Sequence, residues 1–172
     1  MSGKSSRLAF TEACVRQSEF FKRFLGLCEE ENIEQIVAYG LGRVATAVIA
    51  MHQAVFCACL ADALRISELS AYDPAFDAED TEFLSSLGYR LEESFLDYRA
   101  GRRTLVFMPH CDWPVNLEAA RFILEGDRQA IMYSNRLQGR IEGFEEIVFG
   151  GGYPRSDVFN DCKLHRVHSD DE

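Results

Sequence analysis

Residues 36–45, Ile-Val-Ala-Tyr-Gly-Leu-Gly-Arg-Val-Ala, decide the fold of this chain. A short apolar run ends in a glycine turn, and a long apolar stretch typical of a buried helix follows. Doubly wound α/β domains use this order of strand, turn and helix to present backbone N–H groups to a phosphate or a carboxylate. The spacing is G-x-G-x-x-A, with Ala45 in place of the third glycine. We therefore take Gly40, Leu41 and Gly42 as candidates for binding a nucleotide-like ligand. The alternative is that the glycines only permit a tight turn and close helix packing.

The rest of the chain alternates between helix and strand patterns. Helices are predicted at 7–28, at 44–64, between Asp77 and Gly88, and from Pro114 to Gly126; strands are predicted at 33–38, 65–72, 89–94, 104–108, 129–133, 147–149 and 163–167. This alternation predicts an α/β fold: a single Rossmann-like three-layer domain with a mostly parallel sheet, helices on both faces and an N-terminal helix. We expect the helix at 44–64 to lie between the sheet and the N-terminal helix. The chain then divides into a helical extension at 1–32, the α/β domain at 33–168 and an acidic tail at 169–172.

The composition is that of an acidic globular protein. The 172 residues carry a formal net charge of -10, with a pI of about 4.9. An acidic surface repels phosphate groups, so binding to nucleic acid or to an anionic membrane is not expected. The first ten residues contain no apolar signal-peptide core, so the six cysteines are expected to be reduced thiols in an intracellular protein. The apolar stretch at 44–64 contains His52, Gln53 and Asp62, which favours a buried helix over a membrane span.

Chemistry-bearing residues follow four of the predicted strands. They are Gly40–Gly42, Asp73, His110–Cys111 and Ser134–Asn135. Ligands of parallel sheets bind beyond the carboxyl ends of the strands, near the point where the strand order reverses. We therefore expect Gly42, Asp73 and His110 to converge on one pocket. Asp73 would hold a ribose there, although it can also be a turn residue before Pro74.

His110 and Cys111 are the candidates for catalysis. An imidazole and a thiol at the end of a buried strand suit acid–base chemistry, a nucleophilic thiolate or a metal site. Adjacent residues of an extended segment point in opposite directions, so the two are not expected to act as a pair. A structural turn is the alternative for both.

A second group of candidates lies near the C-terminus. Cys162, His165 and His168 form a C-x-x-H-x-x-H pattern, which shares one face on a helix but alternates on the strand expected there. Asn160 and Asp161 precede this strand and suit an Asx turn. The pattern is therefore only a weak signal for zinc.

Four motifs come in order along the chain: Tyr39-Gly40-Leu41-Gly42, Tyr72-Asp73-Pro74, Met108-Pro109-His110-Cys111, and Phe159-Asn160-Asp161 with Leu164-His165. Together they resemble the SRR-like domain, named from "sensitivity to red light reduced", over roughly residues 33–165. The resemblance implies a regulatory protein of the cytoplasm or nucleus, linked to circadian timing, red-light signalling and control of haem synthesis. It implies no established reaction. It marks Gly40, Gly42, Asp73, His110, Cys111, Asn160, Asp161 and His165 only as candidate site positions. Relatives tend to have a Gly-Asn-Ser-Phe-like turn where this chain has Tyr133-Ser134-Asn135-Arg136, so a shared ligand is less expected at that turn.

Three functions follow from these patterns. The leading hypothesis is a regulatory protein with a small-molecule cleft at the strand ends, binding a nucleotide or an S-adenosylmethionine-like ligand. The alternative is a methyltransferase or a nicotinamide-dependent oxidoreductase that uses the same cleft, with His110 as acid or base. The third is haem or metal binding through His110, Cys111, Cys162 or His165, although haem is not the expected ligand. Protein partners are open, and the protein is expected to be a monomer or a homodimer.

Overall fold

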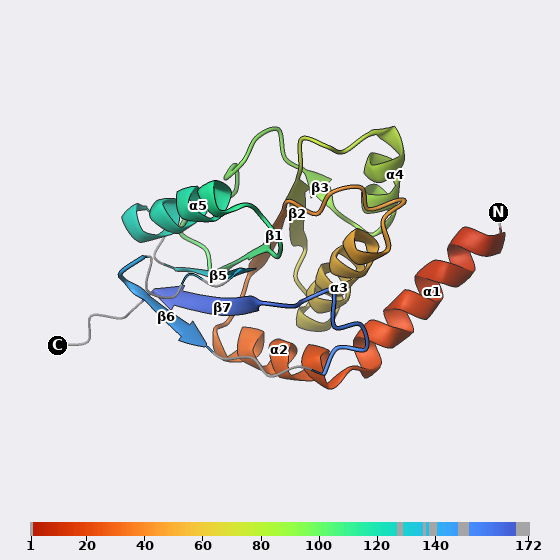
Figure 1. The fold of residues 1–172 in the computed structure, drawn as a ribbon, viewed down its shortest axis with the longest axis horizontal. Helices are drawn as coiled ribbons and strands as arrows, with labels where there is room; N and C mark the ends of the chain where they lie inside the picture. The colour runs from red at the N-terminus through yellow and green to blue at the C-terminus, as the bar shows by residue number, and fades with distance from the viewer. Residues whose placement is uncertain (1, 127–128, 136, 138–140, 148–151, 168–172) are drawn as a thin grey trace.

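The structure is a computed structural model that describes residues 2–126, 129–135, 137, 141–147 and 152–167 (Figure 1). The elements follow one another as α1 (Ser2–Gln17), α2 (Glu19–Glu30), β1 (Gln35–Tyr39), α3 (Val48–Leu64), β2 (Glu68–Tyr72), α4 (Ala78–Ser86), β3 (Arg90–Leu91), β4 (Thr104–Met108), α5 (Trp113–Glu125), β5 (Ala130–Asn135), β6 (Phe144–Ile147) and β7 (Cys162–Val167). The predicted acidic tail at 169–172 and His168 lie outside the described residues.

The described strands form one sheet in the order β3-β2-β1-β4-β5-β7-β6. Strands β1 to β5 are all parallel, whereas β7 runs antiparallel to both β5 and β6. The chain winds outward from β1 through β2 to β3, and then outward in the other direction from β4 to β5. The strand order therefore reverses between β1 and β4, which is where ligands of such sheets bind. The predicted mostly parallel sheet is confirmed.

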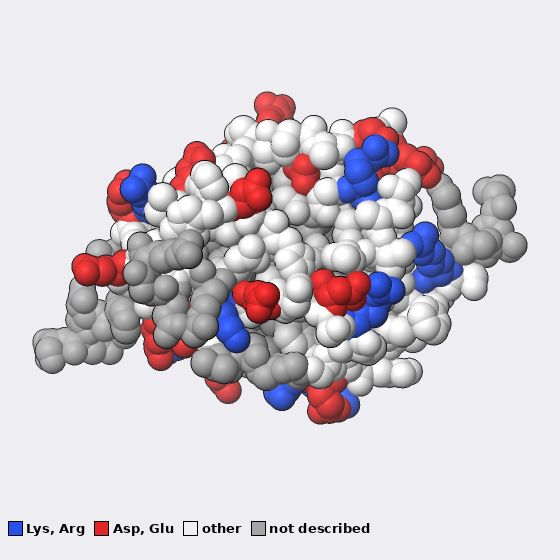
Figure 2. All heavy atoms as spheres, viewed as in Figure 1, with Lys and Arg blue, Asp and Glu red and all other residues white. Residues whose placement is uncertain are grey.

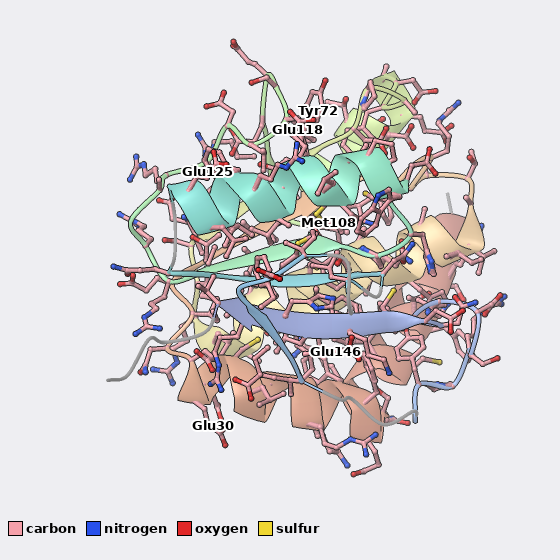
Figure 3. The ribbon with its side chains drawn as sticks, turned by 60° about the vertical axis from the view of Figure 1, so that its left-hand side comes forward. Glu30, Tyr72, Met108, Glu118, Glu125 and Glu146 are labelled. Carbon is pink, nitrogen blue, oxygen red and sulfur yellow. The ribbon has the colours of Figure 1, made fainter. Side chains whose placement is uncertain are left out.

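The two faces of the sheet are covered by different elements, which gives the predicted three layers. Ile36 and Phe107 point into a core shared with α1, α2, α3 and α4, whereas Val37 and Met108 point into a second core under α5. Successive side chains of a strand point to opposite faces of the sheet. Both sets are apolar here because both faces of the sheet are buried. Figure 3 shows the sheet between α5 and α2.

The N-terminal helix is interrupted, contrary to the single helix predicted over 7–28. Ser18 has extended backbone geometry, and its hydroxyl accepts a hydrogen bond from the N–H of Phe21 at 3.1 Å, so it caps a second helix. The same hydroxyl donates to the carbonyl of Val15 at 2.8 Å and closes the end of α1. The apolar pattern of Phe20, Phe24 and Cys28 lies wholly within α2.

Helix α3 begins at Val48, four residues later than predicted. Residues 44–46 form a turn instead, and the N-cap residue Ala47 makes no side-chain capping hydrogen bond. The position of α3 agrees with the prediction, because it contacts β1 and β2 on one side and α1 and α2 on the other. No helix in the described part of the chain combines the length and the apolarity that a membrane span requires.

Other boundaries differ from the prediction at the sheet edges. Strand β3 is only two residues long, because the charged residues from Glu92 onward leave the sheet. Strand β6 ends at Ile147, where the predicted strand began; residues 148–149 lie outside the described residues. Strand β5 continues past Tyr133, so Ser134 and Asn135 belong to the strand itself.

Candidate functional site

The carboxyl ends of the parallel strands lie at one edge of the sheet. Tyr39 pairs with Tyr72, and Met108 pairs with Ser134. Strand β7 runs the opposite way, so its first residue, Cys162, pairs with Asn135 at the same edge. The structure therefore brings Gly40, Asp73, His110, Asn135 and Asp161 to a common edge, and we call it the carboxyl edge.

The glycine turn after β1 is closed by the protein's own carboxylates. Gly42 donates its backbone N–H to Asp73 Oδ2 at 2.7 Å, and the other oxygen of Asp73 accepts the N–H of Ala75 at 2.8 Å. Ala45 donates its N–H to Asp80 Oδ1 at 2.9 Å. Gly40 and Gly42 both have positive φ, at 65° and 71°, which explains glycine at both positions.

Asp80 joins the turn to α4. Its carboxylate is fully buried and also accepts from Arg43 Nε at 2.7 Å and from the N–H of Asp77 at 3.2 Å. Burial alone would raise the pKa of Asp80, but the hydrogen bonds from Ala45, Asp77 and Arg43 outweigh it and lower the pKa. Asp80 is therefore a structural carboxylate in the capping box of α4.

These contacts make the turn a poor phosphate cradle. A phosphate at the N–H groups of Gly42 and Ala45 would have to displace two carboxylates and remain beside their negative charge. The N-terminus of α3, which would add its dipole in a dinucleotide site, begins only at Val48. The sequence spacing resembles a dinucleotide turn, whereas the contacts favour a ligand without phosphate at this position.

Cys111 packs against the same turn from β4. Its thiol occupies the space into which a side chain on Gly40 would project, and it donates weakly to the carbonyl of Tyr39 at 3.6 Å. Burial, with Asp73 and Asp112 nearby, raises the pKa of Cys111 to about 12. Since the thiolate is the nucleophile, Cys111 is a packing thiol at neutral pH rather than a reactive one. Leu41, between the two glycines, is buried in the core.

His110 lies in a left-handed backbone conformation, with φ of 68°. Its ring Nε2–H donates to the carbonyl of Val158 at 3.0 Å, and its backbone N–H donates to Asn135 Oδ1 at 3.1 Å. The side chains of His110 and Cys111 therefore contact different groups. A non-glycine residue in this conformation is uncommon, and such positions cluster at functional sites.

Asn135 connects β4, β5 and β7 at the carboxyl edge. Besides accepting from His110, it donates Nδ2–H to the carbonyl of Cys111 at 3.3 Å and accepts from the thiol of Cys162 at 3.6 Å. The neighbouring Ser134 is buried and donates its hydroxyl to the carbonyl of Asn135 at 2.9 Å. Burial raises the pKa of Cys162 to about 12, so this thiol also remains protonated at neutral pH.

Residues 152–161, which we call the strap, run along the face covered by α2 and α3 and lead into β7. His52 and Gln53 of α3 hold the strap. His52 Nδ1 and the hydroxyl of Tyr153 share a hydrogen bond of 2.7 Å, and Gln53 Nε2 donates to the carbonyl of Val158 at 2.8 Å. Sequence reasoning missed these two residues as site elements, although two adjacent polar residues within an apolar helix were the signal that could have found them.

A pocket of about 250 Å³ opens beside the strap. Its polar and charged lining comes from the strap and the start of β7, and its apolar lining from aromatic rings: Arg155, Ser156, Asn160, Asp161, Lys163, Phe20, Tyr153 and Phe159. Phe20 and Phe159 stack with ring centroids 4.9 Å apart. Cys162, which donates to Asn135, also lines this strap pocket and links it to the carboxyl edge. Of the predicted ligand-binding residues, Asn160 and Asp161 line this cavity, whereas Gly42, Asp73 and His110 do not.

His165 is not brought to the edge. It pairs with Met132 in the middle of β7 and is buried at 1% exposure. Its Nε2 has no hydrogen-bond partner among the described residues. Burial lowers the pKa of His165 to about 4, although the nearby Glu146 carboxylate acts to raise it. Cys162 lies three positions earlier and points to the other face of the strand. Within the described residues, no three His, Cys, Asp or Glu side chains are grouped as metal ligands.

The fold is a single α/β domain of the Rossmann-like class. The chain belongs to the SRR1 domain family, whose SRR1 domain it matches over residues 13–165. A crystal structure of a protein from Thermoplasma acidophilum is also similar, with a TM-score of 0.45 and 11% sequence identity over 94% of this chain and 98% of that chain. This similarity is too low to bear on function.

Proposed function

We propose that this chain is a regulatory protein that senses a small metabolite bound in the strap pocket. The observation that carries the proposal is a cavity at the end of the carboxyl edge where the strap leads into β7, away from the reversal of strand order between β1 and β4. The chain's own carboxylates occupy the glycine turn, so the strap pocket is the better candidate of the two.

The size and lining of the pocket limit the ligand. A cavity of about 250 Å³ is slightly below the 300–1,000 Å³ typical of sites for drug-sized ligands, so a whole dinucleotide exceeds it. Lys163 is half-buried at the pocket and has no carboxylate partner among the described side chains, whereas Arg155 is paired with Asp157 at 2.8 Å. We expect a small organic acid or amino acid whose anionic group meets Lys163 and whose body packs against the aromatic rings.

A bound ligand could act on the protein through the hydrogen bonds that fix the strap. His52, Gln53 and His110 bind it through hydrogen bonds, so a ligand that contacts the strap competes with or reinforces these contacts. The processes implied by the family resemblance, circadian timing, light signalling and haem synthesis in the cytoplasm or nucleus, are the first in which to look for an effect. Deleting the gene and restoring it as wild type or Lys163→Gln tests this link, with haem content and rhythm period as the readouts.

The binding experiment begins with native mass spectrometry of the purified protein, followed by thermal-shift screening of small organic acids and amino acids. A ligand at a hundred times its Kd adds about 2.7 kcal/mol of stability. Lys163→Gln should abolish the shift of any hit. Lys22→Gln, which changes an exposed lysine of α2 paired with Glu19, should leave it intact. A shift that survives Lys163→Gln contradicts the proposed site.

An S-adenosylmethionine-dependent methyltransferase is the second candidate. The observation that favours it is the strand order, since an antiparallel β7 between β5 and β6 is typical of such enzymes, although a fold alone does not fix a function. Asp73, just after β2, would then accept a hydrogen bond from the ribose as well as the one that it accepts from the N–H of Gly42. A thermal shift with S-adenosylmethionine that is lost in Asp73→Asn and kept in Lys163→Gln would favour this candidate over the strap pocket.

A further inference from the structure

A second cavity, unrelated to the carboxyl edge, lies between α1, α3 and α4. This groove has a volume of about 370 Å³. Its apolar lining comes from Leu8, Met51 and Phe83, one residue from each helix, and its charged rim from Arg7 on α1 and from Glu79 and Glu82 on α4. An apolar floor with a charged rim is the usual make-up of a surface that accepts a protein side chain. We call it the α1–α4 groove.

Among the described residues, the most exposed large apolar side chains lie on the helices that form this groove. Phe10 on α1 is 68% exposed, and Val48 and Ile49 at the start of α3 are 37% and 36% exposed. Figure 1 shows the first turns of α1 extending beyond the body of the molecule toward the N-terminus. A phenylalanine this exposed on a projecting helix is an available anchor for an interface.

Phe10 cannot fill the groove of its own copy. Leu8 lines the groove, and residues two apart on a helix point to nearly opposite sides. Arg7, by contrast, is three residues before Phe10 and shares its side of the helix. Phe10 therefore faces away from its own groove, and Arg7 lies between Phe10 and Leu8 around the helix, at the rim of the groove.

The charges on these helices are complementary between copies. The chain carries a formal net charge of -10, yet α1 contains Lys4, Arg7 and Arg16, the last of them paired with Asp62, against the single acid Glu12. Helix α4 contains only acids among its charged residues, and Figure 2 shows acidic side chains over this corner of the molecule; Asp80 is bound to Arg43, and Glu79 and Glu82 line the groove. A basic helix on an acidic body is attracted to the acidic helix of a second molecule.

We propose that the α1–α4 groove binds α1 of a second copy of this chain, forming a two-fold symmetric dimer. Phe10 of each copy enters the groove of the other, and Arg7 faces Glu82 of the other copy. The same surface serves both molecules, as a two-fold interface requires. This dimer is independent of the strap pocket and of the ligand proposed for it.

Sedimentation equilibrium and light scattering over a range of micromolar concentrations test the dimer. The wild-type protein should form dimers, with a Kd that weakens as salt is added. Phe10→Glu should weaken the Kd by at least about 30-fold, the effect of losing a central aromatic anchor. Phe10→Leu is the matched control and should retain the dimer. Because Phe10 is exposed, the variants should keep the wild-type melting temperature of the monomer.

A charge swap identifies the contact as intermolecular. Arg7→Glu alone and Glu82→Lys alone should each be monomeric, since each places like charges face to face in both halves of the dimer. An equimolar mixture of the two variants should form dimers, because both contacts then pair opposite charges. A monomeric wild type, a dimer unaffected by Phe10→Glu, or a mixture that stays monomeric would each overturn the proposal.

Discussion

The thiol of Cys111 fills the space where a side chain on Gly40 would begin. Gly40 follows β1 and Cys111 follows β4, so this contact lies where the strand order reverses. In many doubly wound domains the corresponding space lies open to a ligand. Here the chain closes it with a buried thiol on one side and the carboxylate of Asp73 on the other.

Gly40→Ala should therefore destabilise the protein much more than Gly42→Ala. Both glycines have positive φ, which costs a residue with a side chain about 1–2 kcal/mol. A Cβ on Gly42 would meet nothing within 4 Å, whereas one on Gly40 would collide with Cys111. Urea unfolding of the single variants and of the Gly40→Ala/Cys111→Ala pair measures the difference. The pair should recover part of the loss; equal effects at the two glycines would refute the contact.

Asp80→Asn should destabilise the fold even though no ligand is involved. The carboxylate is buried and accepts from Ala45, Asp77 and Arg43, so its loss leaves donors without a charged acceptor at a cost of about 1–3 kcal/mol. Asp62→Asn is the control. The Asp62 side chain is 73% exposed, so its ion pair with Arg16 should contribute less than about 1 kcal/mol to stability. Thermal or urea unfolding distinguishes the two, and equal losses would mean that Asp80 does not anchor the turn.

The layers of the fold were predictable because both faces of the central strands are buried. The unbroken apolar run at 104–108 and the apolar residues at 36–39 could only be strands covered on both sides. The late start of α3 could not be predicted, since it accompanies hydrogen bonds from Gly42 and Ala45 to Asp73 and Asp80, more than thirty residues away. Local propensity contains no information on such contacts.

The sequence could predict which edge of the sheet carries the candidate residues, but it could not predict the strap pocket. Strand ends that follow parallel strands must share an edge, so the meeting of Gly40, Asp73 and His110 there followed from the alternation of elements. The strap pocket depends on His52 and Tyr153, which lie 101 residues apart and meet only because α3 packs beneath the strap. Asn160 and Asp161 entered the candidate set through the family resemblance rather than through their chemistry.

His165 should make the protein less stable as the pH falls from 7.5 to 5. The pKa of His165 is about 4 in the folded protein and about 6.5 in the unfolded chain. Below about pH 6.5 the unfolded chain therefore binds a proton that the folded protein does not, and the free energy of unfolding falls as the pH decreases toward 4. Over this range the linkage amounts to about 2 kcal/mol. His165→Leu removes this titration, and its unfolding free energy should change less between the two pH values. His52, whose pKa burial also lowers, titrates in both proteins and cancels in the comparison. Identical pH dependence would show that His165 is protonated equally in both states.

Gln53 and His110 should be coupled through the strap, because both donate to the carbonyl of Val158. Gln53→Leu or His110→Ala alone leaves this buried carbonyl with one donor, so each should cost about 0.5–1.5 kcal/mol. The double variant leaves the carbonyl without either donor and should cost more than the sum of the two. Hydrogen exchange within the strap should then rise sharply in the double variant, while β1 and β4 remain protected. A double-mutant cycle from urea unfolding measures the coupling. Additivity within about 0.3–0.5 kcal/mol would mean that the two side chains hold the strap independently.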